Sequence, residues 1–221
     1  MVRQPRLTTT LLARPARQGA TLIAQRRLER VKEAYAQLSL HDADTLHELR
    51  VAMRRLRSCL RTYRRELRGV VSERVRRSLR AAAHRTNPAR DADVQLVWLR
   101  QRGGLTAEGR VARQWLIDRL TLRRDRELAL VKDALTKTLP LVLTELERDL
   151  SRASSAPAAT ASGGRQRTLG DETRKAIYKQ TKRVVSAIGE ARSMKGAEAM
   201  HEAAKTFARR TKRMADRIAA S

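Results

Sequence analysis

Aromatic residues, cysteine and acidic side chains are all scarce in this chain of 221 residues. Phe, Trp and Tyr make up 3% of it, which argues against a sheet core, because strands favour aromatic and β-branched residues. The single cysteine, Cys59, cannot form a disulfide within the chain, which suits a reducing compartment. Its apolar neighbours predict a buried thiol rather than a nucleophile.

Several sequence features that an enzyme or a membrane protein needs are also missing. No apolar run approaches the roughly 20 residues of a membrane-spanning helix, so we expect a soluble, cytoplasmic protein. No glycine-rich phosphate loop and no metal-ligand spacing is present. The only close acid pair, Asp91 and Asp93, stands beside Arg90, where another cation is disfavoured. We therefore expect no catalytic residues, no metal and no cofactor.

Positive charge is abundant and unevenly distributed. The chain holds 49 Lys and Arg against 23 Asp and Glu, a net charge of +26. Residues 47–100 contain 15 basic and 5 acidic side chains, residues 105–152 contain 10 and 8, and residues 165–221 contain 15 and 6. A nearly balanced middle thus separates two basic zones. This pattern predicts a strongly anionic partner that both zones could contact.

Two parallel rows of side chains follow one expected helix over residues 43–68. Both rows advance by alternating steps of three and four, which keeps each on one side of an α-helix. The apolar row consists of Leu46, Leu49, Met53, Leu56, Leu60, Tyr63 and Leu67. The basic row consists of His47, Arg50, Arg54, Arg57, Arg61, Arg64 and Arg68. Arginine binds two phosphate oxygens with its planar fork, so the basic row suits a polyanion.

The residue composition predicts an all-α protein. The expected helices cover residues 20–38, 43–68, 70–85, 89–100, 107–137, 141–152, 171–188 and 196–219. Four parts follow from this pattern: a basic, disordered tail (1–18), an N-terminal helical bundle (19–152), a flexible linker (153–168) and a C-terminal helical part (169–221). The linker is rich in Ser, Ala and Gly; an ordinary surface loop is the alternative.

Two further groups of residues extend the candidate site. Asn87 and Pro88 predict a helix start, with Asn87 as the cap, and Arg90 follows in the first turn, where the helix dipole favours anions. In the C-terminal part, two helical rows carry Lys175, Lys179 and Lys182, and His201, Lys205, Arg209 and Lys212. His47 and His201 each open a basic row, which suggests an internal duplication. Either histidine position also fits an ordinary structural role.

The segment His47–Ser58, with a His, an Arg one turn later and an Arg-Arg-Leu-Arg cluster, resembles the first motif of the CHAD family, the conserved histidine α-helical domain. Arg90-Asp91-Ala92-Asp93-Val94 resembles its Arg-Asp motif. The resemblance implies two pseudo-symmetric, antiparallel helical bundles around a basic groove that binds inorganic polyphosphate without catalysis. It implies ligand contacts at His47, Arg50, Arg54, Arg57 and Arg90; the helical row extends them to Arg61 and Arg64.

The second half departs from the family pattern. Ala204 follows His201 where the family has a basic residue, and the later cations Lys205, Arg209 and Lys212 come one position late. No second Arg-Asp motif follows. We therefore expect an abbreviated or divergent second half that completes the groove.

Other anionic partners remain open at this stage. The main alternative is nonspecific binding of RNA or duplex DNA, which needs the same cations. Against it, the few aromatic residues fall mostly on apolar faces, whereas single-stranded sites need stacking platforms. A basic amphipathic surface could also bind an anionic membrane or a polyphosphate granule. The sequence leaves the oligomeric state open.

Overall fold

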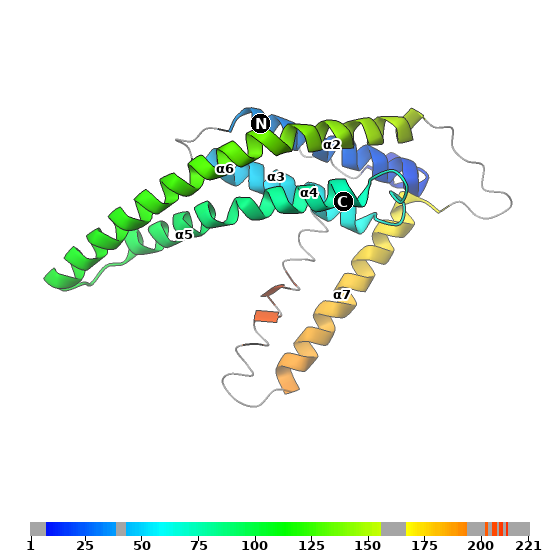
Figure 1. Cartoon of the computed structure of the whole chain (residues 1–221). Coiled ribbons are helices and arrows are strands. Elements are labelled where there is room, and N and C mark those ends of the chain that lie inside the picture. Colours follow the sequence, from blue (N-terminus) through cyan, green and yellow to red (C-terminus); the bar gives the residue numbers. More distant parts are fainter. Residues whose placement is uncertain are drawn as a thin grey trace. The chain divides into compact units, whose positions relative to one another are not determined.

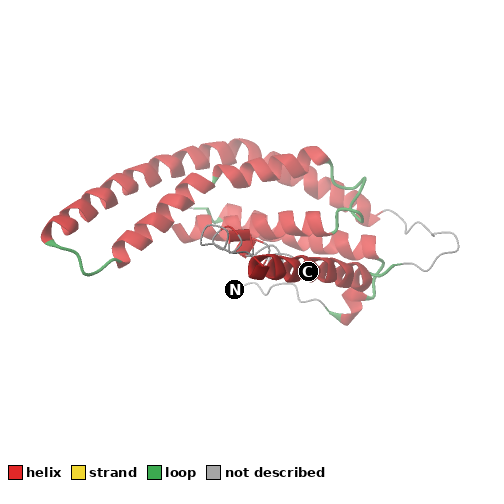
Figure 2. Cartoon of the chain, turned by 90° about the horizontal axis from the view of Figure 1, so that it is seen from below, coloured by secondary structure: helices red, strands yellow, loops and turns green. Residues whose placement is uncertain are grey.

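The computed structural model describes residues 8–38, 43–155 and 167–193, together with residues 202, 205, 206, 208, 209 and 211. Within these residues the regular structure is helical and contains no strand, which confirms the all-α prediction (Figures 1 and 2). The helices are α1 (Thr9–Leu12), α2 (Ala16–Ala36), α3 (Ala43–Thr62), α4 (Glu73–Arg85), α5 (Asn87–Gln101), α6 (Ala107–Ser155) and α7 (Leu169–Ser193).

The chain forms two compact units, which we describe separately. Unit 1 combines the chain up to Glu29 with Arg54–Ser72 and the chain from Glu147 onward. Unit 2 combines Arg30–Met53 with Glu73–Leu146. Each unit therefore joins segments that are far apart in the sequence. The pseudo-symmetric relation between two halves stays a prediction.

The apolar row on α3 is buried along its whole length, as its periodicity predicts. All seven side chains are 2% exposed or less: Leu46, Leu49, Met53, Leu56, Leu60, Tyr63 and Leu67. Burying one such side chain stabilises a fold by about 1.5–3 kcal/mol. Because the apolar row faces the core, the basic row one residue behind it lies at the edge of the same helix.

Helix α3 ends at Thr62, six residues earlier than we expected. The following residues form turns, in which the N–H groups of Val70 and Val71 both donate to the carbonyl of Leu67. Gly69 then adopts a φ of +75°, which lets the chain reverse, because glycine enters this region without steric cost. Arg64 and Arg68 consequently lie beyond α3, and helical spacing no longer positions them.

One helix, α6, replaces the two that we expected over residues 107–137 and 141–152. Pro140 lies inside it, although proline lacks the N–H that would bond to the carbonyl four residues earlier. Buried leucines continue on both sides of the proline: Leu135, Leu139, Leu143 and Leu146. Their packing maintains the helix in spite of the lost hydrogen bond.

Helical structure also begins earlier in the chain than expected. Helix α1 starts after Thr8, whose side-chain oxygen accepts a hydrogen bond from the N–H of Leu11 at 3.2 Å, and α2 starts at Ala16. Both fall within the segment 1–18 that we expected to be a disordered tail. Residues 1–7, most of the expected linker and most of the expected helix over 196–219 lie outside the described residues.

In unit 1, the start of α7 is joined to the chain segment before α2. Pro15 and Thr168 form an isolated antiparallel bridge, in which the N–H of Ala16 donates to the carbonyl of Arg167 and that of Leu169 to Arg14, both at 2.9 Å. The hydroxyls of Tyr63 and Thr173 form a buried hydrogen bond of 2.9 Å. These contacts anchor α7 within unit 1.

We expect Gly19→Ala to destabilise unit 1 by about 1–3 kcal/mol, the usual cost of overpacking. A Cβ atom at Gly19 would lie 2.8 Å from Cδ2 and 2.9 Å from Cβ of Leu169, which is itself fully buried. Thermal unfolding followed by circular dichroism would measure the loss. Gly189→Ala in α7 is the matched control, because no atom lies within 4 Å there and alanine favours a helix. A Gly19→Ala variant as stable as wild type would contradict the expected clash.

Candidate functional site

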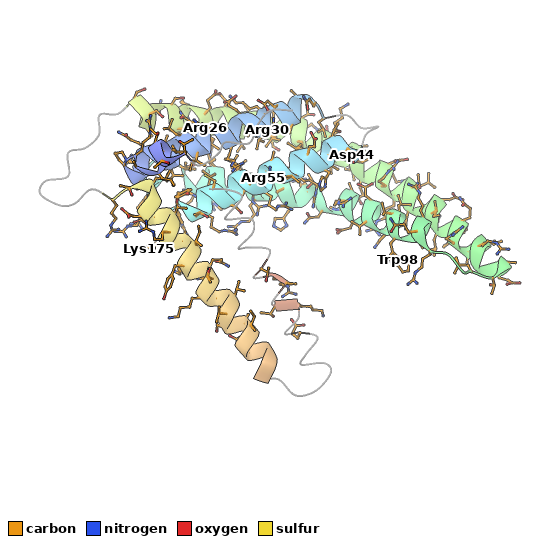
Figure 3. The ribbon with its side chains drawn as sticks, turned by 180° about the vertical axis from the view of Figure 1, so that it is seen from behind. Arg26, Arg30, Asp44, Arg55, Trp98 and Lys175 are labelled. Carbon is orange, nitrogen blue, oxygen red and sulfur yellow. The ribbon has the colours of Figure 1, made fainter. Side chains whose placement is uncertain are left out.

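Three helices of unit 2 line one open pocket, to which two of them contribute arginines. The pocket has a volume of about 310 Å³. Its lining residues are Asp44 and His47 from α3, Arg90, Asp93, Leu96, Val97 and Arg100 from α5, and Arg124 from α6. Asp44 is labelled in Figure 3. The histidine motif and the Arg-Asp motif, which are far apart in the sequence, therefore meet in this pocket.

Arg50 joins α3 to the start of α5. Its Nη1 donates to Oγ1 of Thr86 and, at 3.2 Å, to Oδ1 of Asn87. Thr86 is fully buried, and its hydroxyl donates to the carbonyl of Ala83 at 2.7 Å. The guanidinium of Arg50 thus helps to position the Arg-Asp motif. Its contact with a ligand stays a prediction.

The start of α5 differs from the expected cap. The helix begins at Asn87, the capping position is Thr86, and the Thr86 side chain makes no capping hydrogen bond. Asn87 was therefore wrongly predicted as the cap; its side-chain oxygen accepts from Arg50 instead. Pro88 stands in the first turn as expected, followed by the half-buried Arg90. Arg90 lies at the positive end of the helix dipole, which favours a bound anion.

Asp93 is the buried acid of the pocket, with 7% of its surface exposed. Burial raises the pKa of its carboxyl above the ordinary value of 3.8, although Arg124, Arg90 and Arg50 act to lower it. Desolvation therefore outweighs three nearby guanidinium groups. Asp91, by contrast, is exposed to solvent. An incoming anion would meet the negative charge of Asp93 among the cations that attract it.

Most of the basic row on α3 lies in unit 1. Arg54 and Arg57 are half-buried on α3, and Arg61 is exposed, with its Nη2 donating to Oγ of Ser58 at 3.2 Å. Arg64 is exposed in the turns after the helix. Of this row, His47 alone is among the residues that line the pocket. The other ligand contacts in the row stay predictions.

The C-terminal candidates are only partly described. Lys175, labelled in Figure 3, Lys179 and Lys182 are exposed on α7 at helical spacing. Lys205 and Arg209 are also exposed, and Nζ of Lys205 lies 3.5 Å from a carboxylate oxygen of Glu202. His201 and Lys212 lie outside the described residues. Contacts between these C-terminal side chains and a ligand stay predictions.

Sequence analysis missed two cations of the pocket, Arg100 and Arg124. Arg100 has a recognisable signal, because Arg90, Asp93, Val97 and Arg100 follow one another at steps of three, four and three on one face of α5. Arg124 has no such signal in the sequence, because it belongs to the nearly neutral middle of the chain. Only the packing of α6 places it in the pocket.

The two tryptophans lie on helix faces that are open to solvent. Trp98 is 54% exposed and Trp115 is 59% exposed. The Arg102 guanidinium carbon lies 4.5 Å from the centre of the Trp98 ring, and that of Arg119 lies 5.5 Å from the Trp115 ring. The scarcity of exposed aromatic rings is therefore a weaker argument against nucleic acid than it was from the sequence.

Among the residues that the structure describes, no group of three or more His, Cys, Asp or Glu side chains could hold a metal ion. None of the helices described is long and apolar enough to cross a bilayer.

Comparison with known families covers nearly the whole chain. The family model of the CHAD domain matches residues 13–214. This range includes both motifs that meet in the pocket and extends over α7. No curated protein sequence matches the chain.

Proposed function

Because this chain belongs to the CHAD domain family, we propose that it binds inorganic polyphosphate through the pocket of unit 2, without a catalytic role. The family is known for polyphosphate binding and is generally noncatalytic. Ligand contacts at Arg54, Arg57, Arg61 and Arg64, and at the C-terminal cations, are further predictions of their own. Such binding would recruit the protein to polyphosphate granules in the cytoplasm.

The convergence of His47, Arg90, Arg100 and Arg124 on one pocket is the observation that supports this proposal most. Guanidinium groups bind phosphate oxygens through charge-assisted hydrogen bonds, which are roughly twice as strong as neutral ones. Arginines from α5 and α6 and a histidine from α3 line the pocket, so together they can contact several phosphates of one chain. A single solvated helix face would not bring together cations so distant in the sequence.

Nucleic acid remains the second candidate, and the exposed Trp98 and Trp115 favour it. The pocket itself argues for a ligand without bases. Its lining contains no Phe, Tyr or Trp, whereas proteins that bind single strands typically stack bases on such rings. A bare phosphate chain needs only the cations that are present.

A competition titration at fixed, near-physiological salt tests the proposal. Labelled long-chain polyphosphate is bound to the full chain and displaced by unlabelled polyphosphate, duplex DNA, RNA or heparin. We expect polyphosphate to compete at the lowest concentration per charge. Equal competition by all four polymers per charge would overturn the proposal and indicate a nonspecific polyanion binder.

We expect Asp93→Asn to increase polyphosphate affinity several-fold at neutral pH, because it removes a negative charge that faces the arginines of the pocket. Because the pKa of the Asp93 carboxyl is raised above 3.8, this carboxyl becomes protonated and neutral at a higher pH than an ordinary aspartate does. The wild type should therefore approach the variant in both affinity and stability at acidic pH. Binding measured for both proteins across this range, by fluorescence anisotropy, would show the difference shrinking.

The matched control is Asp91→Asn, which makes the same charge change on the exposed side of α5. It should alter affinity less than Asp93→Asn at every pH. If Asp93→Asn instead weakens binding, the carboxylate holds Arg90 and Arg124 in place rather than competing with the ligand.

A further inference from the structure

The end of α5 and the start of α6 form a helical hairpin, residues 94–126, that lacks a core of its own. The two helices run side by side and are joined by the loop after Gln101 (Figures 1 and 2). No residue from Val97 to Glu127 is buried. Large apolar side chains are nevertheless exposed along both helices: Val94, Val97, Trp98, Val111, Trp115, Leu116 and Leu122.

All but two of these side chains, Val97 and Leu116, form apolar rows on the outer faces of the two helices. On α5, Val94 and Trp98 are one turn apart, opposite the buried Ala92 and Leu96. Figure 3 shows Trp98 on the side of α5 that faces away from α6. On α6, the outer row contains the exposed Val111, Trp115 and Leu122, while half-buried Ile117 and Leu120 lie on the other side of that helix. The hairpin is therefore apolar on both of its outer faces.

The charge of the hairpin is strongly positive. It contains eight arginines, no lysine and three acids. Two of the arginines, Arg102 and Arg119, stack over Trp98 and Trp115. Each stacked pair combines an apolar ring with a cation, and such amphipathic side chains favour the boundary between lipid and water. A partner surface that complements the hairpin is therefore apolar in its interior and negatively charged at its boundary with water.

Three occupants could cover such a hairpin, and the arrangement favours one of them. In a contact with a second copy of the chain, the eight arginines of one hairpin would face the eight of the other and repel them. A partner helix would cover one outer face and leave the apolar row on the other in water. A lipid interface surrounds the tip of a hairpin, so it accounts for apolar rows on both faces.

The positions of the tryptophans along the helices fit this geometry. At a rise of about 1.5 Å per residue, Trp98 lies roughly 5 Å before the end of α5. Trp115 lies roughly 12 Å after the start of α6 by the same measure. Interfacial helices bury their apolar side chains about 5–10 Å into the boundary between headgroups and acyl chains. Trp98 therefore lies within that depth of the hairpin tip, and Trp115 reaches the headgroup region when the tip enters slightly deeper.

We propose that the α5–α6 hairpin docks tip-first onto an anionic phospholipid bilayer, with Trp98 and Trp115 at headgroup depth and the arginines on lipid phosphates. The contact is peripheral and reversible. The outer faces of the hairpin carry this contact, whereas Arg100 and Arg124, which also belong to the hairpin, line the pocket.

Intrinsic fluorescence tests this directly, because both tryptophans of the chain lie in the hairpin. The full chain is mixed with vesicles of phosphatidylcholine, with or without phosphatidylglycerol. We expect the protein to sediment with the anionic vesicles only, with a blue shift of tryptophan emission and protection from iodide quenching. Sedimentation without that shift would overturn the proposal, since it means adsorption through cations elsewhere.

The double variant Trp98→Ala and Trp115→Ala should lower partitioning onto anionic vesicles by about tenfold or more, given the apolar area of two rings. Tyr178→Ala in α7 is the matched control, because Tyr178 is a 71% exposed aromatic residue outside the hairpin; it should bind like wild type. Equal partitioning of the double variant would contradict the proposal. A dimer that the double variant converts to a monomer, measured by light scattering, would assign the surface to a second copy instead.

Discussion

Replacing Arg90 and Arg100 by glutamine is expected to weaken polyphosphate binding by about 100-fold. Each arginine lines the pocket from the same face of α5, and a hydrogen bond to a charged group contributes about 1.5–3 kcal/mol. Two lost contacts at the lower end amount to about 3 kcal/mol, or roughly two factors of ten in affinity. Glutamine keeps an apolar stem and a good helix propensity, so the fold should remain intact.

The salt dependence of binding separates a lost contact from a general loss of charge. Each phosphate contact adds to the slope of log affinity against log salt concentration, so the double variant should show a shallower slope in isothermal titration. The matched control is Arg77→Gln with Arg80→Gln, which removes two exposed charges from α4 outside the pocket. If both double variants bind equally well, the pocket is not the site.

Leu56→Ala should lower the stability of the chain by about 3 kcal/mol, within the range measured for buried leucines. Leu56 lies in the middle of the apolar row of α3 and is 0% exposed, so the truncation leaves a cavity that the surrounding side chains fill only in part. For a protein of this size the loss corresponds to a fall in melting temperature of about 6–12 °C. Calorimetry would measure it.

Leu141→Ala provides the comparison, since Leu141 on α6 is 73% exposed. The same chemical change should there alter stability by no more than about 0.5 kcal/mol. A similar melting temperature for both variants would show that the α3 row does not carry the packing assigned to it. Two separate transitions in calorimetry would indicate that the two units unfold independently.

Local periodicity was enough to predict α3 and its two rows. Seven apolar residues at alternating steps of three and four leave one side of a helix to be buried, whatever packs against it. The same reasoning went wrong at the end of α3, because the apolar spacing continues through Tyr63 and Leu67 while the backbone has already left the helix. It also went wrong at Pro140, where the packing of neighbouring leucines outweighs the loss of one hydrogen bond.

Among the residues of the candidate site, too, local patterns predict some and only tertiary packing brings in the others. His47 and Arg90 could be singled out because each belongs to a motif, and Arg100 could have been found from its spacing on α5. The place of Arg124 in the pocket and the burial of Asp93 could not be predicted from the sequence, because both depend on how α6 packs against α5. The contacts of Arg50 with Thr86 and Asn87 likewise join residues that no local pattern connects.

The sequence by itself determined that this protein is helical, strongly basic and a member of the CHAD family. These properties follow from composition, from the 3.6-residue period and from two short motifs, all of which are local. Only the tertiary structure decided which cations share a pocket, which acid is buried among them and which tryptophans are exposed. Burial and proximity arise from contacts between distant segments, and those contacts set the desolvation and the electrostatic fields on which binding depends.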